Sequence, residues 1–491
     1  MLSKSRFVRG LQCHKSLWLY SHRPELREKP SASQQAIFDS GAEVGELAQQ
    51  LFPGGVLVPY AGLTFSEQIE QTQAAIAAGV STIYEATFLF DDIFVKVDIL
   101  HRAVDGWELY EVKSATRCKE VFLNDLAVQY HVVEGAGISV ARAYLIHINN
   151  RYERHGRVEV DQLFSRLDVS DEVRSRRQDV KAEVVRQKTV LGSSLPEFDI
   201  GPHCQNPYPC DFKSHCWAHV PTPSVFDLAD IGKPDAFALY RRGMVRLEDI
   251  PLTELGWRQQ LQVRGTLQHQ DHIDQIAIRR FLDGLWHPLC FLDFETTCMT
   301  PVPLFDGTRP YQQIPFQFSL HIQDKPEAAL RHVTFLAEAG QDHQEAFMQA
   351  LANALPENAC ILTYNQAFEI ARLKAIAVRR PHWHDKVCKI TAGIRDLMRP
   401  FRDKSIYLWP MAGSYSIKRV LPALVPELSY DELSIGNGEA ASIAWLYLYH
   451  NPDAPDAAEV RQRLLEYCHL DTWGMVKIVE RLRELVGDGV F

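Results

Sequence analysis

The alternation of apolar and polar residues predicts a strand at residues 289–297, an apolar run that carries two acids. Side chains of a strand point to alternate faces, so Asp293 and Glu295 are expected on one face and Leu292 and Phe294 on the other. The apolar face predicts contact with a core. The two carboxylates therefore come together on the opposite face.

Two further patterns place acids beside predicted elements. The apolar run at residues 360–362 predicts a strand, followed by a loop and a helix that carries Glu369. Closer to the C-terminal end, Tyr467 and Asp471 stand four residues apart, which places a phenol and a carboxylate on one face of a helix. Helical spacing in this region joins Leu464, Leu465, Cys468, Met475, Val476 and Val479.

A hairpin is predicted in the N-terminal part of the chain. Residues 93–100 alternate as a strand that contains Asp98, and residues 107–112 predict the returning strand after a turn. Glu111 and Lys113 are two residues apart, so they share one face. The pattern brings two carboxylates and one ammonium group together.

Longer helical patterns and a change of character along the chain suggest its organisation. Helical segments are predicted at residues 34–52, 161–190, 228–243 and 259–281. Pro221 and Pro223 open a stretch of short helices, which indicates a connector. The predicted division is a domain at 1–220, a helical connector at 221–283 and a second domain at 284–491.

Composition places the chain among ordinary globular proteins. Its 491 residues are 46% hydrophobic and 23% charged, enough apolar material for two or three cores. The net charge of −10 neither indicates nor excludes nucleic-acid binding, because basic residues can be confined to one groove. No stretch of about 20 apolar residues occurs, and the first residues lack an apolar signal region. We expect a cytoplasmic protein that does not enter a membrane.

The acidic pairs have the chemistry of a divalent-cation site. Neighbouring carboxylates resist joint ionisation unless a cation joins them, and Mg²⁺ or Mn²⁺ prefers oxygen ligands. Two such ions can lower the pKa of an attacking water and stabilise the leaving oxygen of a phosphodiester. A lysine beside two carboxylates can orient the water or stabilise charge on the phosphate.

Cysteines form a second chemical pattern. The chain has ten, and in a reducing compartment metal ligation is more plausible than disulfide formation. Cys204, Cys210 and Cys216 follow at five-residue gaps in a loop rich in Pro and Gly, which is typical of ligands on flexible backbone. They indicate metal ligands, for example of a tetrahedral Zn²⁺ held by the same cysteines or with His203 or His215, and the alternative is that the thiols bind no metal.

Another cysteine, Cys13, stands near the start of the chain, where a short helix is predicted to end. The neighbouring charges of Arg9 and Lys15 are predicted to favour its thiolate. By itself this pattern is also that of a buried cysteine.

The ordered acids of the C-terminal part resemble the motifs of DnaQ-like 3′–5′ exonucleases, which have an RNase H-like fold, in the subclass that ends in Tyr-x-x-x-Asp. The resemblance implies that Asp293, Glu295, Glu369 and Asp471 hold two metal ions and that Tyr467 orients the attacking water. The family usually has Asp where this chain has Glu369.

The N-terminal hairpin resembles the PD-(D/E)XK nuclease core. By that resemblance Asp98 and Glu111 hold Mg²⁺ or Mn²⁺, Lys113 is catalytic, and Gln129 is the motif glutamine of RecB-like members. The tyrosine that usually follows four residues later is Val133 here.

RecB-like nucleases that carry an iron–sulfur cluster take one cysteine upstream and three downstream. The resemblance thus implies that Cys13 joins Cys204, Cys210 and Cys216 around one [4Fe–4S] cluster.

Nearly the full length resembles a bacterial family of unknown role that combines these two nuclease types, with further marks at residues 310–319 and 415–421. The expected fold class is α/β, a RecB-like domain and an RNase H-like domain joined by the connector. The expected function is a metal-dependent nuclease with two active sites, which acts on DNA in repair, processing or defence. The alternatives are a nucleic-acid-binding or scaffold protein with one or both sites decayed, and an RNA 3′–5′ exonuclease.

Overall fold

The computed structural model describes residues 1–298, 300–430 and 433–487. They form two compact units: unit 1 contains residues 1–219 and 300–311, and unit 2 contains residues 220–298 and the described residues from 312 onwards. Of the predicted second domain, residues 299, 431–432 and 488–491 lie outside the described part. Each unit combines helices with a mixed sheet, so the chain is a mixed α/β protein.

Unit 1 is built on a seven-stranded sheet in the order β2-β3-β4-β5-β6-β7, with β1 paired to β4. The strands are β1 (Leu2–Ser3), β2 (Val56–Leu57), β3 (Thr82–Phe90), β4 (Ile93–Ala103), β5 (Gly106–Lys113), β6 (Val140–Ile148) and β7 (Phe164–Asp168). The predicted hairpin is confirmed, since β4 and β5 are antiparallel. β6 runs parallel to β5 after a helical crossover, as a parallel connection requires.

Helices cover both faces of this sheet. The helices of unit 1 are α1 (Lys4–Gln12), α2 (His14–His22), α3 (Ala32–Gln49), α4 (Phe65–Ala77), α5 (Glu120–Gly135), α6 (Val160–Leu163), α7 (Ser170–Ser175), α8 (Arg177–Leu191) and α9 (Lys213–Cys216). Buried Leu126 and Val133 of α5 pack in one core with Val97 and Leu109, whereas Val44 of α3 belongs to a second core. Two apolar layers therefore hold the hairpin between them.

The predicted helix at residues 161–190 is wrong in part. Phe164–Asp168 forms β7, which pairs with β6, and the helical residues divide into α6, α7 and α8. Pairing with the edge of the sheet gives the backbone groups of these residues hydrogen-bond partners, and the local helical pattern did not reveal this pairing.

Unit 2 contains a five-stranded sheet in the order β11-β10-β9-β12-β13. The strands are β9 (Leu289–Thr296), β10 (Pro315–Gln323), β11 (Arg331–Leu336), β12 (Cys360–Thr363) and β13 (Ile394–Asp396). β10 is antiparallel to β9 and to β11, whereas β12 is parallel to β9 and to β13. The predicted strands at 289–297 and 360–362 are both confirmed.

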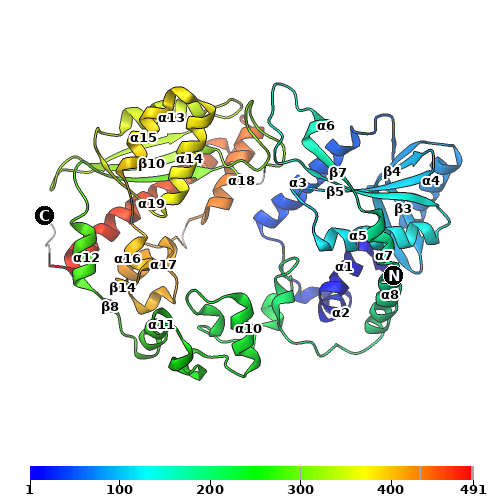
Figure 1. Ribbon diagram of the computed structural model, residues 1–491, viewed down its shortest axis with the longest axis horizontal. Helices are drawn as coiled ribbons and strands as arrows, with labels where there is room; N and C mark the ends of the chain where they lie inside the picture. Colours follow the sequence, from blue (N-terminus) through cyan, green and yellow to red (C-terminus); the bar gives the residue numbers. More distant parts are fainter. Residues whose placement is uncertain (299, 431–432, 488–491) are drawn as a thin grey trace. The chain divides into compact units, whose positions relative to one another are not determined.

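The two faces of this sheet differ in chemistry. Leu292 and Phe294 are buried in a core with Phe347, Leu373 and Ile390, which lie on α13, α14 and α15 respectively. These helices are α13 (Gln344–Ala354), α14 (Gln366–Arg379) and α15 (His384–Gly393). The long helix α19 (Ala457–Leu485) packs against the other face, and Figure 1 shows it in red on the side of β10 opposite α13 and α15.

The remaining elements of unit 2 are short. They are α10 (Lys233–Arg241), α11 (Trp257–Gln268), α12 (Gln275–Leu282), α16 (Arg399–Arg402), α17 (Ile417–Leu424), α18 (Gly438–His450) and a small sheet of β8 (His272–Ile273) with β14 (Ile406–Tyr407). The predicted helix at 259–281 is divided by β8. The residues predicted as a connector belong to unit 2 and contain a small apolar cluster that includes Val225 and Val263.

Among the described residues, no helix has the length and apolar character needed to cross a membrane.

Candidate functional site

The structure brings the four acids of the C-terminal pattern together. Asp293 and Glu295 lie on β9, Glu369 on the first turn of α14 and Asp471 on α19. Asp293 is close enough to the other three acids to be repelled by their charges, and Glu295 is repelled by those of Asp471 and Glu369. Tyr467, one turn before Asp471, is buried beside the same acids.

Burial disfavours the ionised form of all four carboxyl groups. Burial, reinforced by the neighbouring acids, raises the pKa values of Asp293 and Glu295 well above their ordinary range. Burial is also the main cause that raises the pKa of Glu369 to about 8 and that of Asp471 to about 6. An additional positive charge would let all four ionise.

The turn before α14 helps to position Glu369. Asn365, the residue before α14, has a φ of 80°, which lies in the left-handed region. Its N–H and that of Met398 each donate a hydrogen bond of 3.1 Å to Asp396 Oδ1, so a buried carboxylate fixes the turn. Glu369 Oε2 has no hydrogen-bond partner of normal geometry among the described residues.

Three neighbours of this site were not predicted as site residues. The Tyr430 hydroxyl donates a hydrogen bond of 2.6 Å to Asp471 Oδ1. The Lys418 ammonium lies 5.7 Å from the centre of the Tyr467 ring, and its charge opposes the rise in pKa of Glu295 and Asp471. The Cys468 thiol lies 3.9 Å from Asp293 Oδ2.

The backbone also approaches the acids. A Cβ atom on Gly438, the first residue of α18, would lie 3.3 Å from Glu295 Oε2, so the absence of a side chain gives this carboxylate its room. The positive end of the helix dipole there favours a negative charge.

This donor set fits divalent cations. The four buried carboxylates interact electrostatically, while Lys418 acts on Glu295 and Asp471 and Arg372 acts on Glu369. Full ionisation would place four negative charges close together. Mg²⁺ and Mn²⁺ supply positive charge and accept carboxylate oxygens as ligands.

A second cluster of charged residues forms in unit 1. Asp98 lies on β4, Glu111 and Lys113 on β5, and Gln129 on α5. Lys113 Nζ lies 2.6 Å from Glu111 Oε1, and Gln129 Nε2 donates a hydrogen bond of 2.7 Å to Glu111 Oε2. All four residues of the N-terminal prediction thus meet.

Two further residues enter this cluster. Lys4, at the start of α1, places Nζ 3.0 and 3.2 Å from the two oxygens of Glu111. Asp125, one turn before Gln129 on α5, accepts a hydrogen bond of 2.5 Å from Lys113 Nζ. The four-residue spacing to Gln129 was a possible signal for Asp125, whereas no local pattern marked Lys4.

In this cluster the pKa values of the two acids Glu111 and Asp98 shift in opposite directions. Burial raises the pKa of Glu111, but Lys113 and Lys4 outweigh burial and lower it overall. Burial and the charge of Glu111 raise the pKa of Asp98 to about 7, although Asp98 Oδ2 accepts a hydrogen bond of 2.7 Å from Val112 N. Asp98 and Glu111 suit a divalent cation, which must compete with the ammonium of Lys4 for Glu111.

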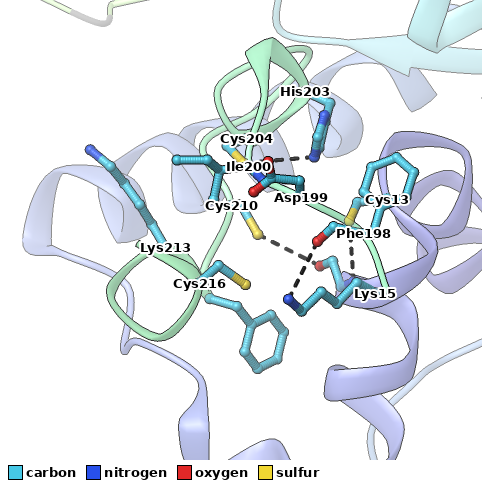
Figure 2. A pocket seen from close by; sticks show the side chains of 12 residues that line it. Cys13, Lys15, Phe198, Asp199, Ile200, His203, Cys204, Cys210, Lys213 and Cys216 are labelled. Carbon is cyan, nitrogen blue, oxygen red and sulfur yellow. Dashed lines mark hydrogen bonds between the residues drawn. The ribbon is translucent and has the colours of Figure 1, made fainter. Parts of the chain in front are cut away.

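Four thiols line a pocket in the same unit. Figure 2 shows Cys13, Cys204, Cys210 and Cys216 around it. Cys13 stands between α1 and α2, and the other three lie in the loop that includes α9. The structure therefore brings the upstream cysteine to the three downstream ones.

Hydrogen bonds hold the two segments together. Gln12 Nε2 donates to the carbonyls of His203 and Tyr208, each at 2.7 Å, and Arg9 pairs with Asp211 at 2.6 and 2.9 Å. Arg9 pairs with Asp211, so its charge does not favour a thiolate at Cys13 as predicted. Burial, with the neighbouring thiols, raises the pKa of Cys13 to about 11.

The donor set fits a metal centre with thiolate ligands. Burial and the other thiols raise the pKa values of Cys210 and Cys216, so a bound metal would be the group that makes them ionise. Sulfur ligands of one tetrahedral zinc lie about 3.8 Å apart, from a Zn–S distance of about 2.3 Å. Among the described residues, the groups of three potential ligand atoms within 4.8 Å of one another include none of these four cysteines.

One family model matches part of the chain. Residues 290–416 match a family described as a domain of unknown function (DUF2779), a range that includes Asp293, Glu295 and Glu369 but ends before Asp471. A search of curated proteins finds no match.

Proposed function

We propose that unit 2 is a metal-dependent 3′–5′ exonuclease with DNA as its favoured substrate. The observation that carries this proposal is the meeting of four buried carboxylates from β9, α14 and α19, whose pKa values burial raises. Sites of this composition suit two divalent ions.

The arrangement of the sheet supports the proposal. The order β11-β10-β9-β12-β13, with β10 antiparallel to its neighbours, is the order expected of an RNase H-like domain. In the DnaQ-like exonucleases that this part resembles, acids on the first strand and on the last helix form the site. Asp293 and Glu295 on β9 and Asp471 on α19 occupy those positions.

Different residues of the chain would have different roles in the reaction. Asp293, Glu295, Glu369 and Asp471 would hold the ions, which lower the pKa of the attacking water and stabilise the leaving oxygen when bound. Tyr430 fixes one oxygen of Asp471. Tyr467 orients the attacking water, and Lys418 stands beside both phenol rings, where its charge can attract a phosphate.

We infer a second, RecB-like nuclease site in unit 1. Asp98 and Glu111 would hold a divalent ion, Lys113 would stabilise charge on the phosphate, and Gln129 holds Glu111 in place. The antiparallel β3, β4 and β5, followed by α5 and the parallel β6, support it. Because the ammonium of Lys4 donates to both carboxylate oxygens of Glu111, Lys4 would have to move before a metal ion binds there.

We further propose that the four thiols hold one [4Fe–4S] cluster, with zinc as the alternative. The four cysteines line one pocket, and thiolates are the ligands of iron–sulfur clusters. A cluster would link the segments around Cys13 and Cys216. Tyr208, in the same loop, interacts electrostatically with Lys113, Asp125 and Glu111, so the loop contributes to the environment of the nuclease site.

The test uses single- and double-stranded DNA and RNA, incubated with the full chain and Mg²⁺, Mn²⁺ or EDTA. We expect metal-dependent cleavage of DNA, loss of 3′-end trimming in Asp293→Asn, and loss of any residual cleavage when Lys113→Ala is added. Asp324→Asn, an exposed acid that pairs with Arg331 in the same unit, is the matched control. Trimming of RNA alone would support the RNA exonuclease, and no cleavage of any substrate would support the binding or scaffold protein.

A further inference from the structure

Three histidines meet in unit 2 outside the carboxylate site. His321 lies on β10, His332 on β11 and His469 on α19. His321 and His332 are direct partners across the antiparallel pair, and their rings stack with centroids 4.4 Å apart. Each of the three offers a nitrogen, and these atoms lie within 4.8 Å of one another. Three elements distant in sequence thus contribute three imidazoles to one cluster.

The spacing suits a metal ion better than a hydrogen bond. His469 Nδ1 and His332 Nε2 are 3.5 Å apart, which is long for a hydrogen bond. Two nitrogen ligands of a tetrahedral zinc lie about 3.3 Å apart, from a Zn–N distance of about 2.0 to 2.1 Å.

Burial also favours the neutral form of two of the rings, His321 and His332. Burial, together with the other two imidazoles, lowers the pKa of His321 to about 3. Burial is the main cause that lowers the pKa of His332. A neutral imidazole can bind a metal ion without first losing a proton.

Hydroxyl groups hold the rings from outside. Thr472 Oγ1 lies 2.9 Å from His321 Nδ1, which leaves Nε2 of that ring for an ion. Ser319 Oγ lies 2.9 Å from His332 Nε2 and 2.6 Å from Thr472 Oγ1, so it keeps a partner when an ion takes the nitrogen. His332 is exposed, which opens one side of the group to solvent.

We propose that His321, His332 and His469 bind one transition-metal ion of the zinc class, with its fourth position open to solvent. Imidazole suits zinc, copper and nickel, whereas carboxylates suit magnesium and manganese, so this site is chemically distinct from the acids. The ion would tie α19 to β10 and β11. Because α19 also carries Tyr467 and Asp471, occupancy would restrain the helix that supplies part of the carboxylate site.

The proposal is tested by zinc content. The chelator-treated full chain is incubated with ZnCl₂ in excess Mg²⁺, desalted and measured by elemental analysis. We expect His332→Ala and His469→Ala each to hold one equivalent of zinc less than the wild type. His382→Ala, an exposed histidine that pairs with Glu345, is the matched control and should equal the wild type. Equal zinc in the wild type, His332→Ala and His469→Ala overturns the proposal.

Two comparisons exclude other sources of zinc. The four cysteines are unchanged in all these proteins, so they contribute equally. Asp293→Asn should keep the zinc equivalent, and its loss there would assign the ion to the carboxylates and overturn the proposal. Thermal unfolding gives an independent readout: ZnCl₂ should raise the Tm of the wild type and not that of His332→Ala, whereas the same rise in both proteins contradicts a histidine site.

Discussion

Glu369→Gln removes one ionisable group from the carboxylate cluster and keeps its shape. Glu369 is 1% exposed, and burial with the charge of Asp396 raises its pKa to about 8 from the ordinary 4.5. The folded protein therefore binds a proton at this group across a pH range in which the unfolded chain has released it. Stability must fall as the pH rises from about 4.5 to 8, and glutamine abolishes this contribution.

The magnitude follows from the size of the shift. The pKa differs by about 3.5 units between the folded and the unfolded chain, and each unit corresponds to about 1.4 kcal/mol. Ionisation of Glu369 can therefore lower the free energy of unfolding by at most ~5 kcal/mol. Below pH 4.5 the wild type and Glu369→Gln should differ little, because the carboxyl is protonated in both the folded and the unfolded wild-type chain.

The assay is urea unfolding in EDTA at pH 4.5, 6 and 8, with hydrogen exchange on peptides from β9 and α14 to localise the effect. The wild type should lose several kcal/mol relative to Glu369→Gln over this range, and Mn²⁺ in place of EDTA should reduce the loss by supplying positive charge. Glu338→Gln, which changes an acid that is 72% exposed, is the matched control and should follow the wild type. Parallel pH profiles for the wild type and Glu369→Gln would refute the reasoning.

Three further predictions concern the other groups. Anaerobically purified protein should be brown with broad absorbance near 400 nm, and Cys210→Ser should lose the colour, whereas stoichiometric zinc without iron or sulfide contradicts the cluster. Lys4→Met should destabilise unit 1 by about 3 kcal/mol in EDTA, since Glu111 and Asp125 lose a cation, and Mg²⁺ should restore the Tm; an unchanged Tm in EDTA contradicts the role of Lys4. Tyr467→Phe should slow 3′-end trimming while Mn²⁺ binding, followed by calorimetry, stays unchanged; weaker Mn²⁺ binding contradicts an orienting role.

The parts of the site that depend on short-range periodicity were predictable. The strand at β9 fixes Asp293 and Glu295 on one face, and the helical period of α19 fixes Tyr467 beside Asp471. The hairpin of β4 and β5 likewise follows from alternation and a turn. In each case a repeat of two or about 3.6 residues decides where the side chain points.

Partners that come from distant segments were not predictable. Lys4 reaches Glu111 because α1 begins beside β4, to which β1 is paired, and nothing in the local sequence around Lys4 indicates this contact. Tyr430 and the three histidines depend in the same way on tertiary packing. The charge of Arg9 near Cys13 suggested a thiolate, but Asp211, some 200 positions away, takes that charge.

The edges of elements were the least predictable part of the fold. β7 interrupts the predicted helix at 161–190 because the free edge of β6 offers backbone partners. Residues 300–311 follow β9 in sequence yet belong to unit 1, where Arg154 N donates to the carbonyl of Thr308 at 3.1 Å. Local periodicity holds no information on such long-range pairing.

The central claim is tested most directly by following the two ends of one DNA strand. A single strand labelled at its 5′ end, and a matched strand labelled at its 3′ end, are incubated with the full chain and Mn²⁺. The 3′ label should be released first as a mononucleotide, the 5′ label should appear on a descending ladder, and EDTA or Asp293→Asn should stop both. Release of the 3′ label by Asp293→Asn at the wild-type rate, or no release by the wild type with either Mn²⁺ or Mg²⁺, would contradict the exonuclease.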